Sequence, residues 1–237
     1  VWADLYRIPY ECKKVDENFR IVKEDYYPEN GGVIFPNPNA PTSIYEDLEF
    51  VEDIIRHNQD VIVIVDEAYI DFAGESALSL LDKYDNLIIT QTFSKARSMA
   101  GMRIGYAIAS PLLIKYLNDA KYSFNSYTMN KTSLVYGVEA VKDKEYFAET
   151  TRKIVETRDW AEEEFKKLGF VFPKPSANFI FVSHPEYDAK ELFEAMKAKG
   201  IYVRFWGSER IEQYLRVTIG TREEMEELFA FLREYMM

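Results

Sequence analysis

Two kinds of hydrophobic pattern alternate in the first part of the chain. Short apolar runs bounded by polar loops predict strands at 31–35, 61–65, 87–90 and 104–109. Between them, apolar residues that recur every three or four positions predict helices at 44–58 and 76–84. Strands and helices that alternate in this way predict an α/β fold with a mostly parallel sheet and helices on both faces.

The pattern becomes helical from Pro111 to Leu168 and then changes again. The stretch 145–168 predicts one long helix that ends at Gly169 and connects two lobes. Beyond it, short elements of an α+β lobe are predicted, with strands at 170–172, 178–182, 201–203 and 214–218 and helices at 189–199 and 222–235. We therefore expect an incomplete large domain at 1–143, a connecting helix at 144–168 and a small C-terminal domain at 169–237.

Composition narrows the classes of partner. Forty acidic against 29 basic residues give a net charge of −11, which disfavours nucleic acid and anionic membranes as partners. The single cysteine, Cys12, excludes an intrachain disulfide and fits a reducing, cytoplasmic compartment. The sequence shows no membrane-length apolar run, no signal peptide and no metal-ligand cluster, and both histidines, His57 and His184, are expected at the surface.

Candidate chemistry gathers where two predicted strands end. Asp66 follows one strand and Lys95 the other, and ligands of open α/β sheets bind beyond the carboxyl ends of the strands. An amine can form an imine with an aldehyde, an aspartate can pair with a protonated pyridine nitrogen, and a guanidinium such as that of Arg103 can bind a phosphate. The alternatives are a solvated surface lysine for Lys95, and a helix cap or an ion pair with Lys95 for Asp66.

Four further side chains near these residues are candidates for the site. Two of them have alternative interpretations. Tyr69 could direct its hydroxyl to a ligand ring or bond an unrelated acceptor, and Asn39 could bond a ligand oxygen or shape its proline-rich turn. Thr92 and Ser94 supply hydroxyl groups beside Lys95. Glu67 is expected to be structural.

Five strings occur in the order of a known family, namely Asn37–Thr42, Val65–Phe72, Thr92–Lys95, Ala100–Tyr106 and Tyr214–Thr221. Together they resemble the fold type I pyridoxal-phosphate-dependent aminotransferases, and among these the histidinol-phosphate aminotransferases. The resemblance implies pyridoxal 5'-phosphate as cofactor and transamination of histidinol phosphate with 2-oxoglutarate, a reaction of histidine biosynthesis. It also implies a homodimer, because this fold type builds each active site across a dimer interface.

The resemblance assigns roles to individual residues. Lys95 would form the internal aldimine and shuttle the proton, and Asp66 would hold the pyridinium nitrogen. Tyr69 and Asn39 would contact the ring oxygen, and Thr92, Ser94 and Arg103 would complete the cofactor site, with Ser94 and Arg103 on its phosphate. Arg204 and Arg216 would bind the anionic end of the substrate, and the alternative for both is an ordinary ion pair in a small acidic lobe.

The chain departs from the family pattern in two places. Ala40 and Ser43 stand where relatives often have asparagine and glycine, and Arg97-Ser98 replaces other residues after the lysine. The resemblance begins inside the family's large domain, so we expect a fragment without the amino-terminal arm, the phosphate-binding loop and the aromatic residue that stacks on the pyridine. An aromatic aminotransferase or a phosphothreonine decarboxylase would share Lys95, Asp66 and Arg103, and a catalytically inactive fragment is the third alternative.

Overall fold

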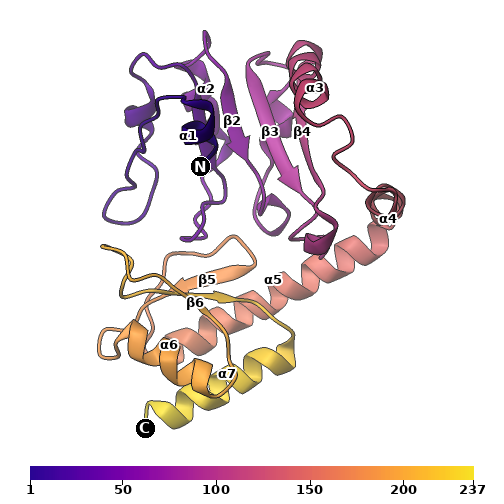
Figure 1. Cartoon of the computed structure of the whole chain (residues 1–237). Coiled ribbons are helices and arrows are strands. Elements are labelled where there is room, and N and C mark those ends of the chain that lie inside the picture. Colours follow the sequence, from indigo (N-terminus) through magenta and orange to yellow (C-terminus); the bar gives the residue numbers. More distant parts are fainter.

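The molecule has two β-sheets, and the long helix α5 (Lys144–Lys167) runs from the larger one down along the smaller one (Figure 1). The computed structural model describes residues 1–237, apart from the side chain of Trp2. The larger sheet and its helices (β1–β4 and α1–α4) form the large lobe. The smaller sheet and its helices (β5–β7, α6 and α7) form the small lobe. Among the described helices, none combines the length and the apolar character needed to cross a bilayer.

The larger sheet has the order β1-β2-β3-β4 and is mostly parallel, as the pattern predicts. Its strands are β1 (Val33–Pro36), β2 (Val63–Asp66), β3 (Leu87–Thr92) and β4 (Gly105–Ala109). The first three run parallel, and β4 is antiparallel to β3. The register places Pro36, Asp66 and Thr90 side by side at the carboxyl edge of the sheet.

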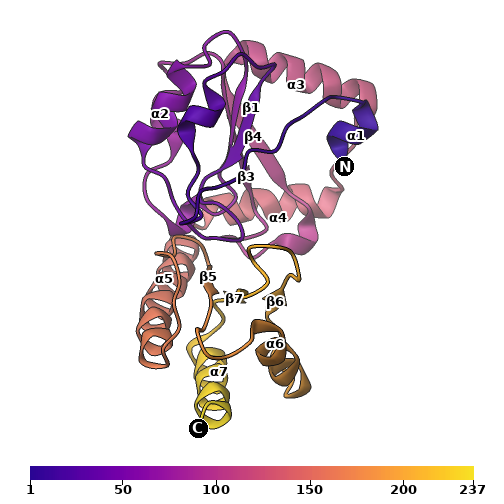
Figure 2. The ribbon, with the colours of Figure 1, turned by 90° about the vertical axis from the view of Figure 1, so that its left-hand side faces the viewer.

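Helices lie on both faces of this sheet. Helix α2 (Leu48–Arg56) buries Val51, Ile54 and Ile55 against one face, together with the 3-10 helix η3 (Ala77–Leu80). Figure 2 shows α1 (Trp2–Tyr6) and α3 (Pro111–Phe124) on the other side, and α4 (Lys131–Lys142) follows α3 along the chain. The remaining short turns are 3-10 helices, η1 (Lys23–Tyr26), η2 (Ile70–Phe72) and η4 (Ala100–Met102).

Two predicted helices of the large lobe are shorter than expected. The helix predicted at 44–58 begins at Leu48, because the Asn37 amide hydrogen-bonds both the N–H and the C=O of Glu46, each at 2.8 Å, and so ties residue 46 to the preceding loop. The helix predicted at 76–84 is only the 3-10 turn η3.

The smaller sheet is antiparallel and has the order β5-β7-β6. Its elements are β5 (Phe179–Val182), α6 (Ala189–Ala198), β6 (Arg204–Phe205), β7 (Leu215–Thr218) and α7 (Arg222–Tyr235). Its core packs Ile180, Val182 and Phe229 against Phe165 of α5. Each lobe has its own large hydrophobic core, and a third, smaller cluster packs Tyr69 and Phe72 against Ala177 and Phe179. The division at 143 and 169 remains a proposal.

The strands predicted at 170–172 and 201–203 are wrong. Each segment directly follows a helix that ends with a pair of backward backbone hydrogen bonds. Phe170 N bonds Phe165 O at 3.0 Å after α5, and Ile201 N bonds Met196 O at 2.9 Å after α6. In this ending the first apolar residue beyond the helix packs back on it, which imitates the start of a strand in the sequence. Of residues 170–172, Val171 forms one isolated bridge with Ser183.

Ser43 of the large lobe hydrogen-bonds the segment of the small lobe that precedes β5. Its side chain is fully buried, and its Oγ accepts from Ser176 N at 3.0 Å and from Ala177 N at 2.8 Å. Its φ of 66° lies in the left-handed region, where glycine has no steric cost and serine does. Ser43 therefore combines backbone strain with two hydrogen bonds between the lobes.

A buried carboxylate, Glu67, ties three strands of the larger sheet together. It accepts from the Ser76 hydroxyl at 2.6 Å, from Ala77 N at 2.7 Å and from the Gln91 amide at 2.8 Å. Gln91 Oε1 in turn accepts from the Tyr106 hydroxyl of β4 at 2.6 Å. Burial raises the pKa of Glu67 above its usual range, against the lowering effect of its hydrogen bonds. The structural role expected from the sequence agrees with these contacts.

Replacing Ser43 should separate strain from hydrogen bonding. Ser43→Ala keeps the left-handed backbone and loses both acceptor contacts, so it should destabilise the protein by about 1–3 kcal/mol. Ser43→Gly loses the same contacts but relieves the strain, so it should be about 1 kcal/mol more stable than Ser43→Ala. Urea unfolding measures both, with Ser79→Ala as an exposed control. Equal stability of Ser43→Ala and the unsubstituted protein would show that the joint contributes nothing.

Removing the Glu67 carboxylate should destabilise the large lobe. Glu67→Ala leaves three donors without their acceptor in a buried place, which should cost about 2–4 kcal/mol in urea unfolding. Glu75→Ala, an exposed glutamate nearby, should stay within about 0.5 kcal/mol. Because the pKa is raised, the stability of the protein relative to Glu67→Gln should increase as the pH falls through the raised pKa of the folded state. A difference that decreases in that direction would contradict the assignment.

Candidate active site

Lys95 lies just beyond the carboxyl edge of the larger sheet. β3 runs two residues past Thr90, and the chain then turns through Phe93 and Ser94 to Lys95. Figure 1 shows the arrowheads of β2 and β3 pointing toward the small lobe. The lysine is half-buried, and its Nζ lies 5.0 Å from the centre of the Tyr69 ring. Its amine is therefore held against an aromatic face and not extended into solvent.

Backbone and hydroxyl contacts fix the turn that carries this lysine. Thr92 Oγ1 accepts from Ser94 N at 3.1 Å and lies 3.0 Å from Ser94 Oγ. Ser98 N donates to Lys95 O at 2.9 Å, and Met99 N donates to Phe93 O at 3.0 Å. The turn therefore closes on itself on both sides of Lys95.

Asp66 and Tyr69 follow β2, next to this turn. Asp66 ends β2 and is half-buried, and its Oδ1 accepts from Ala68 N at 3.1 Å. Tyr69 is buried, and its ring meets the Phe179 ring edge to face, 5.1 Å between centres. The contact between Tyr69 and Phe179 joins the large lobe to β5, the first strand of the small lobe.

Arg103 and Asn39 lie in two loops of the large lobe. Arg103 is exposed, has a left-handed φ of 56° and donates from Nη1 to Ala100 O at 2.9 Å. It precedes Ile104, whose carbonyl accepts from Phe93 N at 3.1 Å, so it lies beside the lysine turn. The hydrogen bonds of Asn39 come from its backbone, to Ile44 and Ser43, each at 2.8 Å.

The two predicted substrate arginines are direct cross-strand partners. Arg204 of β6 pairs with Arg216 of β7, so their side chains stand on the same face of the smaller sheet. The Arg216 guanidinium lies 5.0 Å from the Phe179 ring and 5.5 Å from the Trp206 ring. Its Nε is buried without a hydrogen bond, and neither arginine forms an ion pair with any residue whose side chain the structure describes.

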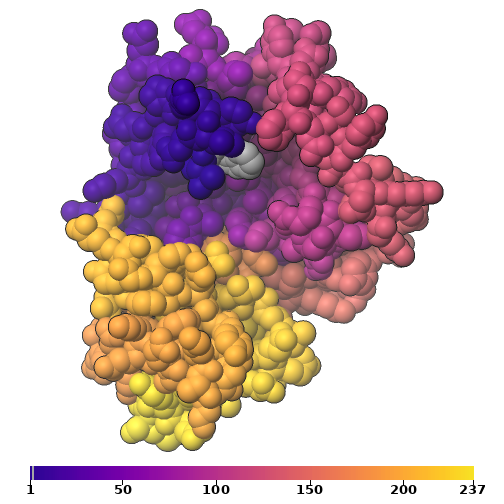
Figure 3. Space-filling view, in the orientation of Figure 1, coloured from indigo at the N-terminus to yellow at the C-terminus, as the bar shows by residue number. Residues whose placement is uncertain are grey.

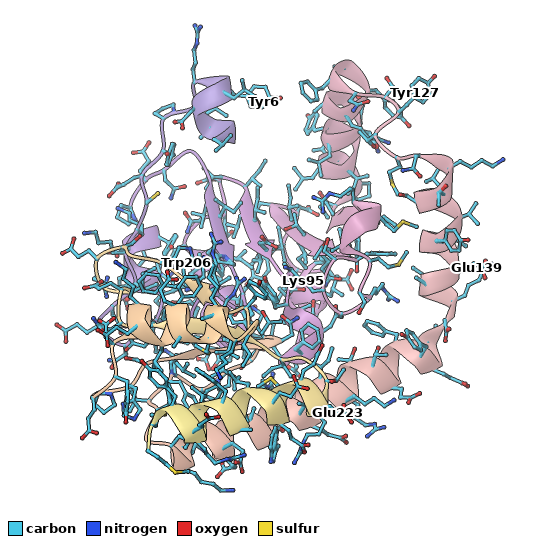
Figure 4. All side chains as sticks on the ribbon, turned by 60° about the horizontal axis from the view of Figure 1, so that its bottom comes forward. Tyr6, Lys95, Tyr127, Glu139, Trp206 and Glu223 are labelled. Carbon is cyan, nitrogen blue, oxygen red and sulfur yellow. The ribbon has the colours of Figure 1, made fainter. Side chains whose placement is uncertain are left out.

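A continuous series of ring contacts connects the amine to the guanidinium. Lys95 lies on Tyr69, Tyr69 meets Phe179, and Phe179 faces Arg216, with about 5 Å at each step. Figure 4 shows Lys95 and Trp206 in the junction between the lobes. Figure 3 shows the surface hollowed above the small lobe, between the N-terminal segment and the α3–α4 region. The structure thus brings Lys95, Tyr69 and Arg216 into one site, with Asp66, Thr92 and Ser94 along the same sheet edge.

Three residues of this region were not found from the sequence. Phe179 and Trp206 contact Arg216, and Arg97 stacks 4.2 Å from the Phe147 ring while donating to Ala140 O at 2.6 Å. The arginine-aromatic-aromatic string at 204–206 is the signal that could have indicated Trp206. The register between β6 and β7 is needed to see that it faces two arginines.

The donor set fits a phosphorylated pyridine aldehyde. Lys95 offers the amine, and the half-buried Asp66 carboxylate has acceptor capacity beyond its bond to Ala68 for a protonated ring nitrogen. Ser94 offers a hydroxyl and Arg103 a guanidinium, the groups that bind phosphate. These are the residues that could hold the cofactor implied by the resemblance.

Comparisons with known proteins show the family of the chain. The family model "Aminotransferase class I and II" matches residues 2–232. The chain is 46% identical over 226 residues to a histidinol-phosphate aminotransferase of Clostridium botulinum (strain Okra / Type B1), covering 95% of this chain and 64% of that protein. It is 44% identical over 236 residues to one of Lactococcus lactis subsp. lactis (strain IL1403), covering 100% of this chain and 66% of that protein. The chain therefore spans about two thirds of the length of these relatives.

Solved structures show the same fold. The histidinol-phosphate aminotransferase from Clostridium acetobutylicum superposes with a TM-score of 0.90 at 23% identity, covering 99% of this chain and 73% of that one. The enzyme of that name from Sinorhizobium meliloti, solved in complex with pyridoxal-5'-phosphate, gives 0.77 at 27% identity, with coverages of 87% and 57%. With the family model matched over nearly its whole length, the chain belongs to the aminotransferase class I and II family.

Proposed function

We propose that these residues belong to an aminotransferase that uses pyridoxal 5'-phosphate and acts on a phosphorylated amine, histidinol phosphate. The observation that carries the proposal is the series of contacts from the Lys95 amine through Tyr69 and Phe179 to Arg216. In this proposal, a nucleophilic amine and an anion-binding guanidinium form the two ends of one site. The names of the similar proteins from Clostridium and Lactococcus support the substrate.

The chain's residues would divide the work between two ends of the site. When bound, the cofactor supplies an aldehyde that condenses with amines and a protonated ring that stabilises negative charge at carbon. Asp66 would accept a hydrogen bond from the ring nitrogen and hold its orientation. Lys95 Nζ would bind the aldehyde carbon at rest and, once released, take the proton from the substrate carbon and return it. Tyr69 would support both groups through its ring and direct its hydroxyl toward the ring oxygen.

Most of the remaining assignments concern binding of the cofactor phosphate and of the substrate phosphate. Ser94 and Arg103 would hold the cofactor phosphate beside Lys95, with Thr92 fixing Ser94 through its bond to Ser94 N. Asn39 would contact the ring oxygen from its loop. Arg204 and Arg216 would hold the phosphate of the substrate in the small lobe. A keto-acid acceptor such as 2-oxoglutarate, a homodimer and a cytoplasmic location complete the proposal.

Lys95 should be the site of covalent cofactor attachment. The unsubstituted protein, incubated with pyridoxal phosphate and reduced with borohydride, should carry one cofactor on the peptide that contains Lys95. Lys95→Ala should lose both this adduct and the visible absorbance band of the bound cofactor, because Lys95 supplies the amine that condenses with the aldehyde. Lys83→Ala, an exposed lysine of the same lobe, should keep both. Mass spectrometry of the digested protein measures the outcome. If the unsubstituted protein carries no adduct at Lys95, the proposal is wrong.

Neutralising Arg216 should weaken binding of the phosphorylated donor. Losing a charge-assisted contact costs about 1.5–3 kcal/mol, so Arg216→Gln should raise KM for histidinol phosphate about 10- to 100-fold. Arg204→Gln should act in the same direction and less strongly, since Arg204 is exposed. Arg222→Gln removes a guanidinium of α7 that stacks on Trp160 of α5, and it should leave KM unchanged. Carbon dioxide release without a keto-acid requirement would instead indicate a decarboxylase.

A further inference from the structure

Trp206 contacts both arginines of the small lobe. It follows β6 directly and is half-buried. Its ring lies 5.4 Å from the Arg204 guanidinium and 5.5 Å from that of Arg216. One indole ring therefore contacts two cations that face each other across adjacent strands.

Two like charges at directly opposite strand positions repel each other and destabilise a sheet. Such a pair is ordinarily relieved by a carboxylate, yet neither arginine forms an ion pair with the residues whose side chains are described. An indole face attracts a guanidinium through its ring quadrupole, and tryptophan does so better than phenylalanine. Trp206 can therefore stabilise both cations without cancelling their charge.

The difference between an indole and a carboxylate matters for a ligand. A carboxylate at this place would occupy the guanidinium donors and compete with an incoming anion. An indole leaves the N–H donors of both arginines available in the plane of each guanidinium. The Arg216 Nε is buried, and no described group accepts a hydrogen bond from it.

We propose that Trp206 is a positioning residue that holds Arg204 and Arg216 together as one doubly charged subsite. Through this pairing it sets the preference for a phosphate dianion over a carboxylate monoanion. The inference rests on the proposed function, because it names the residue that gives the substrate subsite its specificity. Trp206 acts through the arginines and does not itself need to touch the substrate.

The test measures anion binding to the protein saturated with pyridoxal phosphate, by titration calorimetry with inorganic phosphate and with acetate. Trp206→Leu should weaken phosphate binding about 10-fold, because both guanidiniums lose their ring contact. Trp206→Phe should weaken it about 3-fold, since a smaller ring remains. Acetate, which needs only one guanidinium, should change less than about 2-fold in both variants. Tyr202→Leu removes an aromatic ring that is 79% exposed in the same segment and should change neither.

Each outcome separates this inference from the proposed function. Unchanged phosphate binding in Trp206→Leu, together with a loss in Arg216→Gln, would overturn the role of Trp206 and leave the arginine subsite standing. Equal losses for phosphate and acetate would overturn the preference for a dianion. Unchanged phosphate binding in Arg216→Gln would overturn the subsite itself and, with it, the role of Trp206. The inference is supported if phosphate affinity falls in the order Trp, Phe, Leu at position 206 while acetate affinity stays nearly the same.

Discussion

The edge-to-face contact between Tyr69 and Phe179 is the interaction on which the geometry of the site depends. Tyr69 stands at the end of β2 and carries the Lys95 amine on its ring, while Phe179 begins β5 and carries the Arg216 guanidinium. Because each ring contacts a cation of its own lobe and the other ring across the junction, the distance between amine and guanidinium depends on where the two rings meet. A shift of the small lobe would change that distance before it changed either lobe internally.

Buried polar groups hold the lobes around this contact. Ser43 accepts two backbone N–H groups of the small lobe, and Arg158 of α5 donates to Phe72 O at 3.0 Å and to Ala177 O at 3.1 Å. Both residues reach Ala177, two positions before Phe179. Because a buried donor or acceptor that loses its partner costs more than the bond contributes, these contacts resist separation at the place where the rings meet.

Local patterns allowed much of this fold to be predicted, and non-local pairing did not. The strands around Asp66 and Lys95 were predicted because a buried strand needs a continuous apolar run, and α5 was predicted from its helical period. The strand predicted at 170–172 failed because Phe170 is apolar for a different reason, its contact with the end of α5. The placement of Asp66 beside Thr90, a few residues before Lys95, follows from parallel register. The pairing of Arg204 with Arg216 depends on a register that no local pattern encodes.

The charge of the chain sharpens the meaning of that arginine pair. With 40 acidic residues and a net charge of −11, carboxylates are abundant, and two other arginines of the small lobe form ion pairs with them. Arg233 reaches Glu164 at 2.9 Å and Arg222 reaches Glu226 at 2.9 Å. Arg204 and Arg216 instead face rings and each other, which leaves a local excess of positive charge in an acidic protein. Such an excess costs folding free energy, and an anionic ligand is the partner that would offset it.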